Sequence, residues 1–182
     1  MNKTRILFIH GGGNDGYGDD SKLADSLRHN LDKTFEVIFP HMPTPDFDST
    51  DSWTKKIHEY IATYQPTILA GHSFGASNIL QYLVRYGMPK GVKGIFLMAL
   101  PFWGGPGWDY EEYELPSNFA DKLSRKTPLF LYQCRDDEVV DIAHLDLYAT
   151  AMPWATVRRL DHGDHQIGND LSAVARDIVA TK

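Results

Sequence analysis

Short apolar runs alternate with amphipathic segments along the whole chain. Runs of this kind, bounded by glycine, proline or polar residues, are typical of strands buried on both faces of a sheet. The predicted strands span residues 6–9, 35–39, 66–70, 94–100, 129–133 and 156–160. Apolar side chains at helical spacing lie between them and predict helices near residues 21–31, 53–61, 79–84, 142–151 and 171–178. A short helical stretch is also expected near residues 118–123. Because strands and helices alternate, the pattern predicts an α/β fold, a three-layer sandwich with a mostly parallel six-stranded sheet.

The first predicted helix has the clearest start. Leu23, Leu27 and Leu31 repeat every fourth residue. Residues 19–21 read Asp-Asp-Ser, and acidic or hydroxyl side chains before an apolar repeat are typical helix caps. The sequence therefore predicts that this acidic segment caps the helix.

The length and composition are those of one domain. A chain of 182 residues, 42% of them hydrophobic, can bury one core, and a second independent core is not expected. We therefore expect a single domain over residues 1–182. The formal net charge of -6 comes without any run of lysine or arginine, so nucleic acid and anionic membrane surfaces are poor candidate partners.

The cysteine content and the apolar run lengths bear on location. Cys134 is the single cysteine, which excludes an intrachain disulfide and fits a reducing compartment. Apolar residues 6–9 are too few for the core of a signal peptide. No apolar run approaches the roughly 20 residues that a membrane-spanning helix needs. We therefore expect a cytoplasmic protein.

Residues 71–75 read Gly-His-Ser-Phe-Gly, where a predicted strand meets a predicted helix. A nucleophilic serine in Gly-x-Ser-x-Gly occupies a strained turn, and small residues such as Gly71 and Gly75 let the strand and the helix pass closely. This makes Ser73 the candidate nucleophile. The backbone N–H of Phe74 lies at the helix N-terminus, where the positive dipole end can stabilise an oxyanion. A chance pentapeptide on a surface loop is the alternative, and the flanking strand and helix argue against it.

A glycine-rich loop, residues 10–16, follows the first predicted strand. Gly11, Gly13 and Gly16 satisfy the spacing of a dinucleotide site, but no acidic residue stands at the end of the second strand to hold a ribose hydroxyl. Residues 10–13 instead resemble the His-Gly-Gly-Gly loop of esterases and lipases, which donates an oxyanion-hole N–H. We expect Gly12 to be that donor, with Gly11 or Gly13 as near alternatives.

Two polar loops follow the last two predicted strands. Asp136 and Asp137 come after the fifth strand, and His162 and His165 come after the sixth. The carboxyl ends of parallel strands meet at one edge, so these loops should converge with Ser73. A serine nucleophile needs a histidine to take its proton and an acid to orient that histidine. The residues alone leave the choice within each pair open.

The order Ser, Asp, His and the glycine loop resemble the α/β-hydrolase superfamily over nearly the full chain. The resemblance implies a compact α/β-hydrolase fold without a large cap domain. The small size, Pro43 and Pro45 before Trp53, the paired aspartates and a late Gly-x-His look like the small serine hydrolases related to retinoblastoma-binding protein nine. That group tends to carry an aromatic residue near the start of the first helix, where this chain has Tyr17 and no tryptophan.

The family pattern favours one residue of each pair. Its Asp-x-x-Val/Pro turn fits Asp137 with Val140 and leaves Asp136 to cap a turn or face solvent. Its histidine follows a glycine closely, and Gly163 allows a tight turn that projects His165 toward the nucleophile. The resemblance therefore implies Asp137 as the acid and His165 as the base.

The loop after the fourth predicted strand carries large aromatic and acidic side chains. Aromatic rings at the carboxyl edge of a sheet usually roof a pocket, so we expect Trp103 and Trp108 to contact the substrate. Four acids lie between residues 109 and 114 without an intervening lysine or arginine. If they rim the site, they favour a neutral or cationic substrate over an anionic one such as acyl-coenzyme A.

These observations predict a serine hydrolase without a cofactor that cleaves a small carboxylic ester, thioester or amide through an acyl-enzyme on Ser73. The expected partner is a small-molecule substrate, and the sequence does not indicate a protein partner. A catalytically silent interaction protein of the same fold is the alternative, although a binder has no need of the serine, aspartate, histidine and glycine loop together. A metal site at His162 and His165 is weaker still, because ligands on one tight loop have no partner ligand nearby in the sequence.

Overall fold

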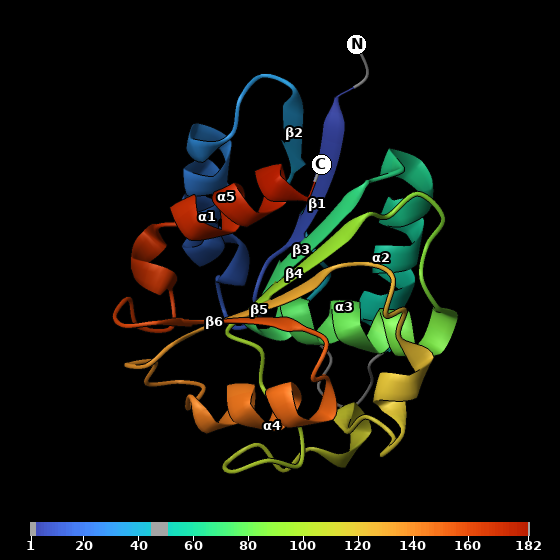
Figure 1. Ribbon diagram of the computed structural model, residues 1–182, viewed down its shortest axis with the longest axis vertical. Coiled ribbons are helices and arrows are strands. Elements are labelled where there is room, and N and C mark those ends of the chain that lie inside the picture. Colours follow the sequence, from blue (N-terminus) through green and yellow to red (C-terminus); the bar gives the residue numbers. More distant parts are fainter. Residues whose placement is uncertain (1–2, 45–50, 182) are drawn as a thin grey trace.

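Six parallel strands form one sheet in the part of the chain that the computed structural model describes, residues 3–44 and 51–181 (Figure 1). Pro45, one of the residues behind the subfamily resemblance, lies outside the described residues. The predicted six-stranded α/β sheet is confirmed, and every strand pair in it is parallel. The strands are β1 (Thr4–Ile9), β2 (Phe35–Ile38), β3 (Ile68–His72), β4 (Gly94–Met98), β5 (Leu129–Cys134) and β6 (Thr156–Leu160).

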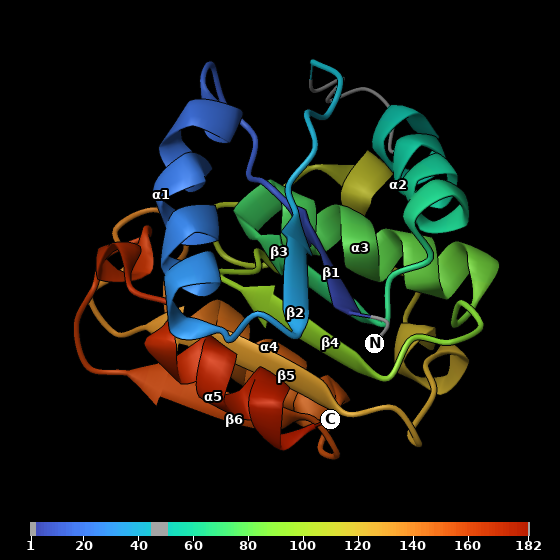
Figure 2. The same cartoon turned by 90° about the horizontal axis from the view of Figure 1, so that it is seen from above.

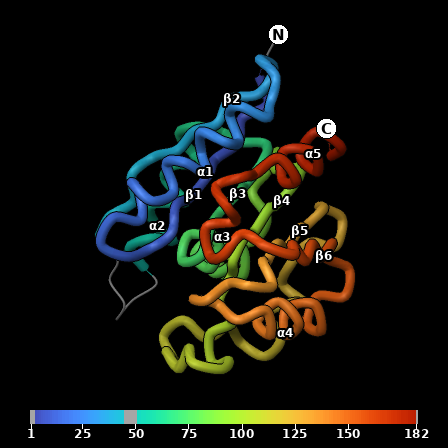
Figure 3. The backbone as a smooth tube through the Cα atoms, turned by 90° about the vertical axis from the view of Figure 1, so that its left-hand side faces the viewer, coloured from blue at the N-terminus to red at the C-terminus, as the bar shows by residue number. Residues whose placement is uncertain are grey.

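Helices cover both faces of the sheet (Figure 2). One face carries α1 (Gly16–Asn30) and α5 (Ser172–Ala180), which lie side by side (Figure 3). The other face carries α2 (Asp51–Tyr64), α3 (Ser73–Tyr86) and α4 (Ala143–Ala151). The short 3₁₀ helices η1 (Glu111–Tyr113), η2 (Phe119–Lys122) and η3 (Ile167–Asn169) lie in the connecting loops, and none of the described helices is long and apolar enough to cross a membrane.

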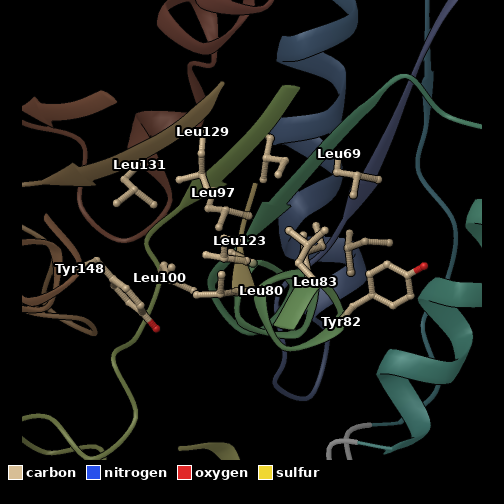
Figure 4. Packing of buried hydrophobic residues seen from close by; sticks show 14 of the residues in the cluster. Leu69, Leu80, Tyr82, Leu83, Leu97, Leu100, Leu123, Leu129, Leu131 and Tyr148 are labelled. Atoms are coloured by element: carbon tan, nitrogen blue, oxygen red, sulfur yellow. The ribbon is translucent and has the colours of Figure 1, made fainter. Parts of the chain in front are cut away.

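Alternate residues of the central strands β1, β3, β4 and β5 fill two separate apolar layers. On β4, Leu97 packs on the α3 side of the sheet, whereas its neighbour Phe96 packs on the α1 side, and both are fully buried. Figure 4 shows Leu80 and Leu83 of α3 extending toward Leu69 and Leu97 of the sheet. Strands covered on both faces need mostly apolar side chains, which explains why these central strands have nearly continuous apolar runs in the sequence.

Two predicted boundaries differ in a way that matters for the site. The third strand was predicted at residues 66–70 and lies at Ile68–His72, so it extends directly to the residue before Ser73. The first helix begins at Gly16, where Asp15 is the cap and its side chain accepts a hydrogen bond from the Gly18 N–H (3.2 Å). The prediction that residues 19–21 cap this helix is wrong, because Asp20 is buried inside it.

The strand order is β2-β1-β3-β4-β5-β6, so successive strands are added first on one side of β1 and then on the other. The connection through α1 leads to β2 on one side of β1, and the connection through α2 leads to β3 on the other. Ile9 at the end of β1 pairs with Gly71 near the end of β3. The glycine loop and the serine turn therefore leave the sheet side by side, at the kind of switch point where open α/β sheets bind ligands.

Candidate active site

Ser73 lies on a strained turn between β3 and α3, with a backbone φ of 49°. A positive φ is costly for a residue with a side chain and persists only where the surroundings enforce it. Here the surroundings are the two glycines. A Cβ on Gly75 would lie 2.2 Å from the carbonyl oxygen of His10, and one on Gly71 would lie 2.9 Å from the Cα of Ala76. The close passage of α3 over the sheet thus fixes the position of the serine.

A continuous chain of hydrogen bonds runs from Ser73 into the protein. The Ser73 Oγ is 3.0 Å from His165 Nε2, and His165 Nδ1 is 2.9 Å from Asp137 Oδ2 and 3.1 Å from Oδ1. A carboxylate only accepts, so Nδ1 carries the proton and Nε2 presents its lone pair to the serine hydroxyl. This geometry lets His165 take a proton from Ser73.

Asp137 is held by four donors. Besides His165, its oxygens accept hydrogen bonds from the N–H groups of Val139 (2.9 Å) and Val140 (2.8 Å) and from the side-chain amide of Gln133 (2.6 Å). Burial by itself raises the pKa of Asp137, but the hydrogen bonds from His165 and Val140 outweigh burial and hold the pKa below its ordinary value. Asp137 is therefore a buried, ionised acceptor behind the histidine.

Asp136 and His162, the alternatives to Asp137 and His165, lie in more exposed environments. Asp136 is half-exposed and accepts hydrogen bonds from the backbone N–H groups of Gly163 (3.3 Å) and Asp164 (3.1 Å). The side chain of His162 is 90% exposed and lies 3.5 Å from Asp136. The structure therefore brings Asp137 and His165 together with Ser73, whereas Asp136 braces the turn that carries His165.

The predicted oxyanion donors lie against each other beside the serine. Phe74 is the second residue of α3, and a Cβ on Gly12 would lie 3.2 Å from the Cβ of Phe74. Of the neighbouring glycines, a Cβ on Gly11 would lie 3.5 Å from the Cβ of Ser73. The backbone of the glycine loop thus runs next to the first turn of α3.

A cavity of about 280 Å³ opens onto Ser73 and His165. Its walls include the glycine loop, Phe74, Val139 and Trp108. Trp103, the other predicted substrate contact, does not line this cavity. It is buried behind Trp108, with ring centroids 5.0 Å apart, and its indole N–H donates to the Ser77 hydroxyl. Trp103 therefore supports the wall that Trp108 forms.

The acids of the aromatic loop are exposed, and none of those between residues 109 and 114 lines the cavity. The carboxylates in the lining are Asp19 and Asp20 of α1, and the described lining residues include no lysine or arginine. Negative charge at the cavity thus comes from the first helix. Among the described residues, no group of three or more histidine, cysteine, aspartate or glutamate side chains is placed to hold a metal ion.

Comparison with protein families gives a match over almost the entire chain. A family model described as Alpha/beta hydrolase family matches residues 6–180. The chain belongs to the alpha/beta hydrolase family. This membership supports a hydrolase as the general class of activity. The search of curated proteins gives no match.

Solved structures of esterases and a thioesterase share the fold of this alpha/beta hydrolase at low identity. The esterase domain of a Rhodothermus marinus protein has a TM-score of 0.69 and 19% identity, over 97% of this chain and 84% of that one. The esterase RhEst1 from Rhodococcus sp. gives 0.73 and 14%, over 98% and 90%. The thioesterase domain from the curacin biosynthetic pathway gives 0.70 and 16%, over 98% and 92%.

Sequence reasoning missed one polar pair beside the site of this hydrolase. Asp20 and His72 are both buried, and Asp20 Oδ2 lies 2.9 Å from His72 Nδ1. The same oxygen accepts the Gly11 N–H (2.7 Å), and His72 Nε2 lies 2.8 Å from the backbone oxygen of His165. No local motif marks Asp20, because its partners are remote in the sequence.

His144 of α4 was missed for the same reason. Its Nδ1 accepts a hydrogen bond from the Phe102 N–H (3.0 Å), so Nε2 carries the proton and donates to the Pro106 carbonyl (3.0 Å). The fully buried imidazole thus ties together the loop that presents Trp108.

Replacement of His144 by alanine should loosen this loop. The Phe102 N–H and the Pro106 carbonyl would lose their partner, which costs about 1–3 kcal/mol. We expect a lower free energy of unfolding and faster amide hydrogen exchange in residues 102–108. His29→Ala, at an exposed position of α1, is the matched control. Unchanged exchange in residues 102–108 would contradict a bracing role for His144.

Proposed function

We propose that this alpha/beta hydrolase is a serine hydrolase that cleaves a small carboxylic ester, thioester or amide through an acyl-enzyme on Ser73. The observation that carries the proposal is the aligned pair of contacts from Ser73 to His165 (3.0 Å) and from His165 to Asp137 (2.9 Å). This arrangement supplies a nucleophile, a general base and an acid that orients the base.

Acylation begins when the Ser73 oxygen attacks the substrate carbonyl carbon while His165 Nε2 takes the hydroxyl proton. Asp137 stabilises the imidazolium that results and remains ionised. The tetrahedral intermediate collapses with cleavage of the bond to the leaving group, which receives the proton from His165. The products of this half-reaction are the acyl-enzyme and a free alcohol, thiol or amine.

Deacylation repeats these steps with water. His165 takes a proton from the attacking water, and the bond between the acyl carbon and the Ser73 oxygen breaks as that oxygen regains the proton. We assign the stabilisation of both oxyanions to the backbone N–H groups of Phe74 and Gly12, with Gly11 or Gly13 as near alternatives for the latter. A donor of this kind is worth about 2.7–4 kcal/mol.

We propose a substrate that is small and not anionic. A cavity of about 280 Å³, walled by Trp108 and Val139, suits a modest apolar group next to the reacting carbonyl. Asp19 is an exposed carboxylate in the lining, whereas Asp20 is paired with His72. Trp108 is therefore our candidate for direct substrate contact, and Trp103 for its support.

The finer family assignment is also a proposal. We place the chain near the small serine hydrolases related to retinoblastoma-binding protein nine because of its size, the aspartate pair and Pro43 before Trp53. Trp53 donates its indole N–H to the Pro43 carbonyl (3.0 Å), and Tyr17 stacks on His41 where that group tends to have its own aromatic residue. A cytoplasmic location fits the single, buried Cys134.

Ser73 should be the site of labelling by a fluorophosphonate probe. Because His165 can accept its proton, Ser73 should react once per chain, and Ser73→Ala should abolish labelling without unfolding the protein. Ser117→Ala, at an exposed loop position, should label like the natural protein. Mass spectrometry of the labelled peptide provides the measurement. A folded protein that resists the probe would favour the alternative of a catalytically silent interaction protein.

Each paired residue provides an internal comparison for the roles of acid and base. Asp137→Ala and His165→Ala should lower kcat for p-nitrophenyl acetate by about 10⁴-fold, because the serine loses its oriented base. Asp136→Ala and His162→Ala should have much smaller effects, since neither side chain reaches the serine. Steady-state kinetics on folded variants decides the matter. The assignment is wrong if Asp136 or His162 proves the more sensitive member of its pair.

Substrate charge should affect turnover through Asp19. A single carboxylate near the reacting group changes the free energy of a charged substrate by about 1 kcal/mol in water, or about fivefold in kcat/KM. We expect a cationic ester to exceed a matched anionic ester, with a difference that shrinks at high salt and in Asp19→Asn. Asp25→Asn, an exposed change on the same helix, should retain the preference. Equal kcat/KM values for the two esters would contradict this role of Asp19.

A further inference from the structure

The buried pair of His72 and Asp20 joins three segments of the candidate site. His72 is the residue before Ser73, Asp20 lies in α1, and together they reach the glycine loop at Gly11 and the backbone of His165. The side chains of His72 and Asp20 are each 1% exposed. Asp20 and His165 are 52 and 93 residues away from His72 in the sequence, so these bonds connect parts of the chain that only folding brings together.

The partners of His72 determine how many protons its ring holds. Nε2 faces the carbonyl oxygen of His165, which can only accept, so Nε2 must carry a proton. Nδ1 faces Asp20 Oδ2, which already accepts the Gly11 N–H. If Asp20 is a carboxylate, Nδ1 must also donate, and the ring is an imidazolium.

The surrounding charges favour this ionised pair. Burial by itself lowers the pKa of His72, but the charge of Asp20, the bonds to Asp20 and to the His165 carbonyl, and the more distant charge of Asp137 raise it above 6.5. Burial raises the pKa of Asp20, but the charge of His72 and the bonds from His72, Gly11 and Gln166 lower it below 3.8. The His165 ring also faces His72, with centroids 4.9 Å apart.

We propose that His72 is a doubly protonated positioning residue that, through its buried ion pair with Asp20, holds the backbone of His165 in register with Ser73. This inference rests on the proposed function, because it concerns how the base is aligned with the nucleophile. His72 contacts no reacting atom. As the residue before the nucleophile, it is joined directly by its side chain to the backbone of the residue that would serve as base.

The pair gives this alignment a defined pH range. The pKa of His72 is raised, so the stability that its ionised pair contributes to the folded site is complete below pH 6.5. This stability is lost as the pH rises through the raised pKa. The pKa of Asp20 is lowered, so the stability that its carboxylate contributes to the folded site is complete above pH 3.8. This stability is lost as the pH falls through the lowered pKa. When His72 loses a proton, one of its two bonds becomes a contact between a lone pair and an acceptor oxygen.

The protonation state can be measured directly by NMR of protein labelled with [¹⁵N]histidine. In the natural protein near neutral pH, both ring nitrogens of His72 should carry protons, and the signal should be absent in His72→Asn. In Asp20→Asn, the ring should hold one proton, because the charge that retains the second is gone. Asp25→Asn should leave the His72 signal unchanged. A singly protonated ring in the natural protein would overturn the proposal.

The positioning role is tested with kinetics on p-nitrophenyl acetate. Asparagine at position 72 can keep the bond to Asp20 but cannot reach the His165 carbonyl, so kcat should fall about 10²-fold with little change in KM. His72→Gln, whose longer side chain can reach that carbonyl, should recover part of kcat. The alkaline decrease in kcat that comes from His72 should be absent in both variants. His29→Asn, on the exposed surface, is the control.

The outcomes separate this proposal from the proposed function. A natural protein that fails to react with a fluorophosphonate overturns the serine mechanism, and the positioning role with it, even if the His72 ring is doubly protonated. A natural protein that reacts, together with a folded His72→Asn variant of equal kcat, overturns the positioning role alone. If His72→Asn does not fold, the test rests on the protonation of the His72 ring in the natural protein, measured by NMR, and on the kinetics of Asp20→Asn. An unchanged kcat in folded Asp20→Asn overturns the proposal.

Discussion

The close passage of α3 over the sheet is the constraint on which the candidate site depends. At Gly75 the space for a side chain is occupied by the carbonyl oxygens of residues 9 and 10, the closer at 2.2 Å from an ideal Cβ. Because glycine has no Cβ, the helix can still pass at this distance and begin immediately at the end of β3. Ser73 then takes a left-handed backbone conformation at the first position of the helix. The core on the α3 side of the sheet holds this turn in place. Strain at one residue is thus supported by apolar burial along the length of the helix.

Hydrogen-bond complementarity then determines the state of four histidines in and around the candidate site. His165 faces a carboxylate on one nitrogen and a hydroxyl on the other, which leaves its lone pair available for the serine proton. His144 and His10 each accept a backbone N–H and are therefore neutral. His72 faces only acceptor oxygens, and we propose that it is charged. In the proposed mechanism, histidine thus serves as a base, as a neutral brace of a loop and as a buried cation, according to what lies opposite each ring.

Membership of the alpha/beta hydrolase family and the geometry around Ser73 are independent observations that support the same proposed chemistry. The family match covers residues 6–180 and supports a hydrolase in general. The distances among Ser73, His165 and Asp137 support a serine mechanism in particular. The cavity lining then restricts the proposed substrates, since Trp108 and the glycine loop surround a small volume and the described lining residues include no lysine or arginine.

The sequence by itself determined the sheet, the helices and the chemical groups at one edge, because apolar periodicity and glycine spacing are local properties of the chain. It predicted Ser73 from the glycines around it, but it left each of the pairs Asp136 with Asp137 and His162 with His165 open without a family resemblance. Only the tertiary structure placed the Asp137 carboxylate opposite His165 and turned Asp136 to the backbone of the following turn. It also decided that Asp20, an apparent helix cap, is a buried partner of His72, because a contact across 52 residues is set by the packing of α1 on the sheet and leaves no pattern in the local sequence.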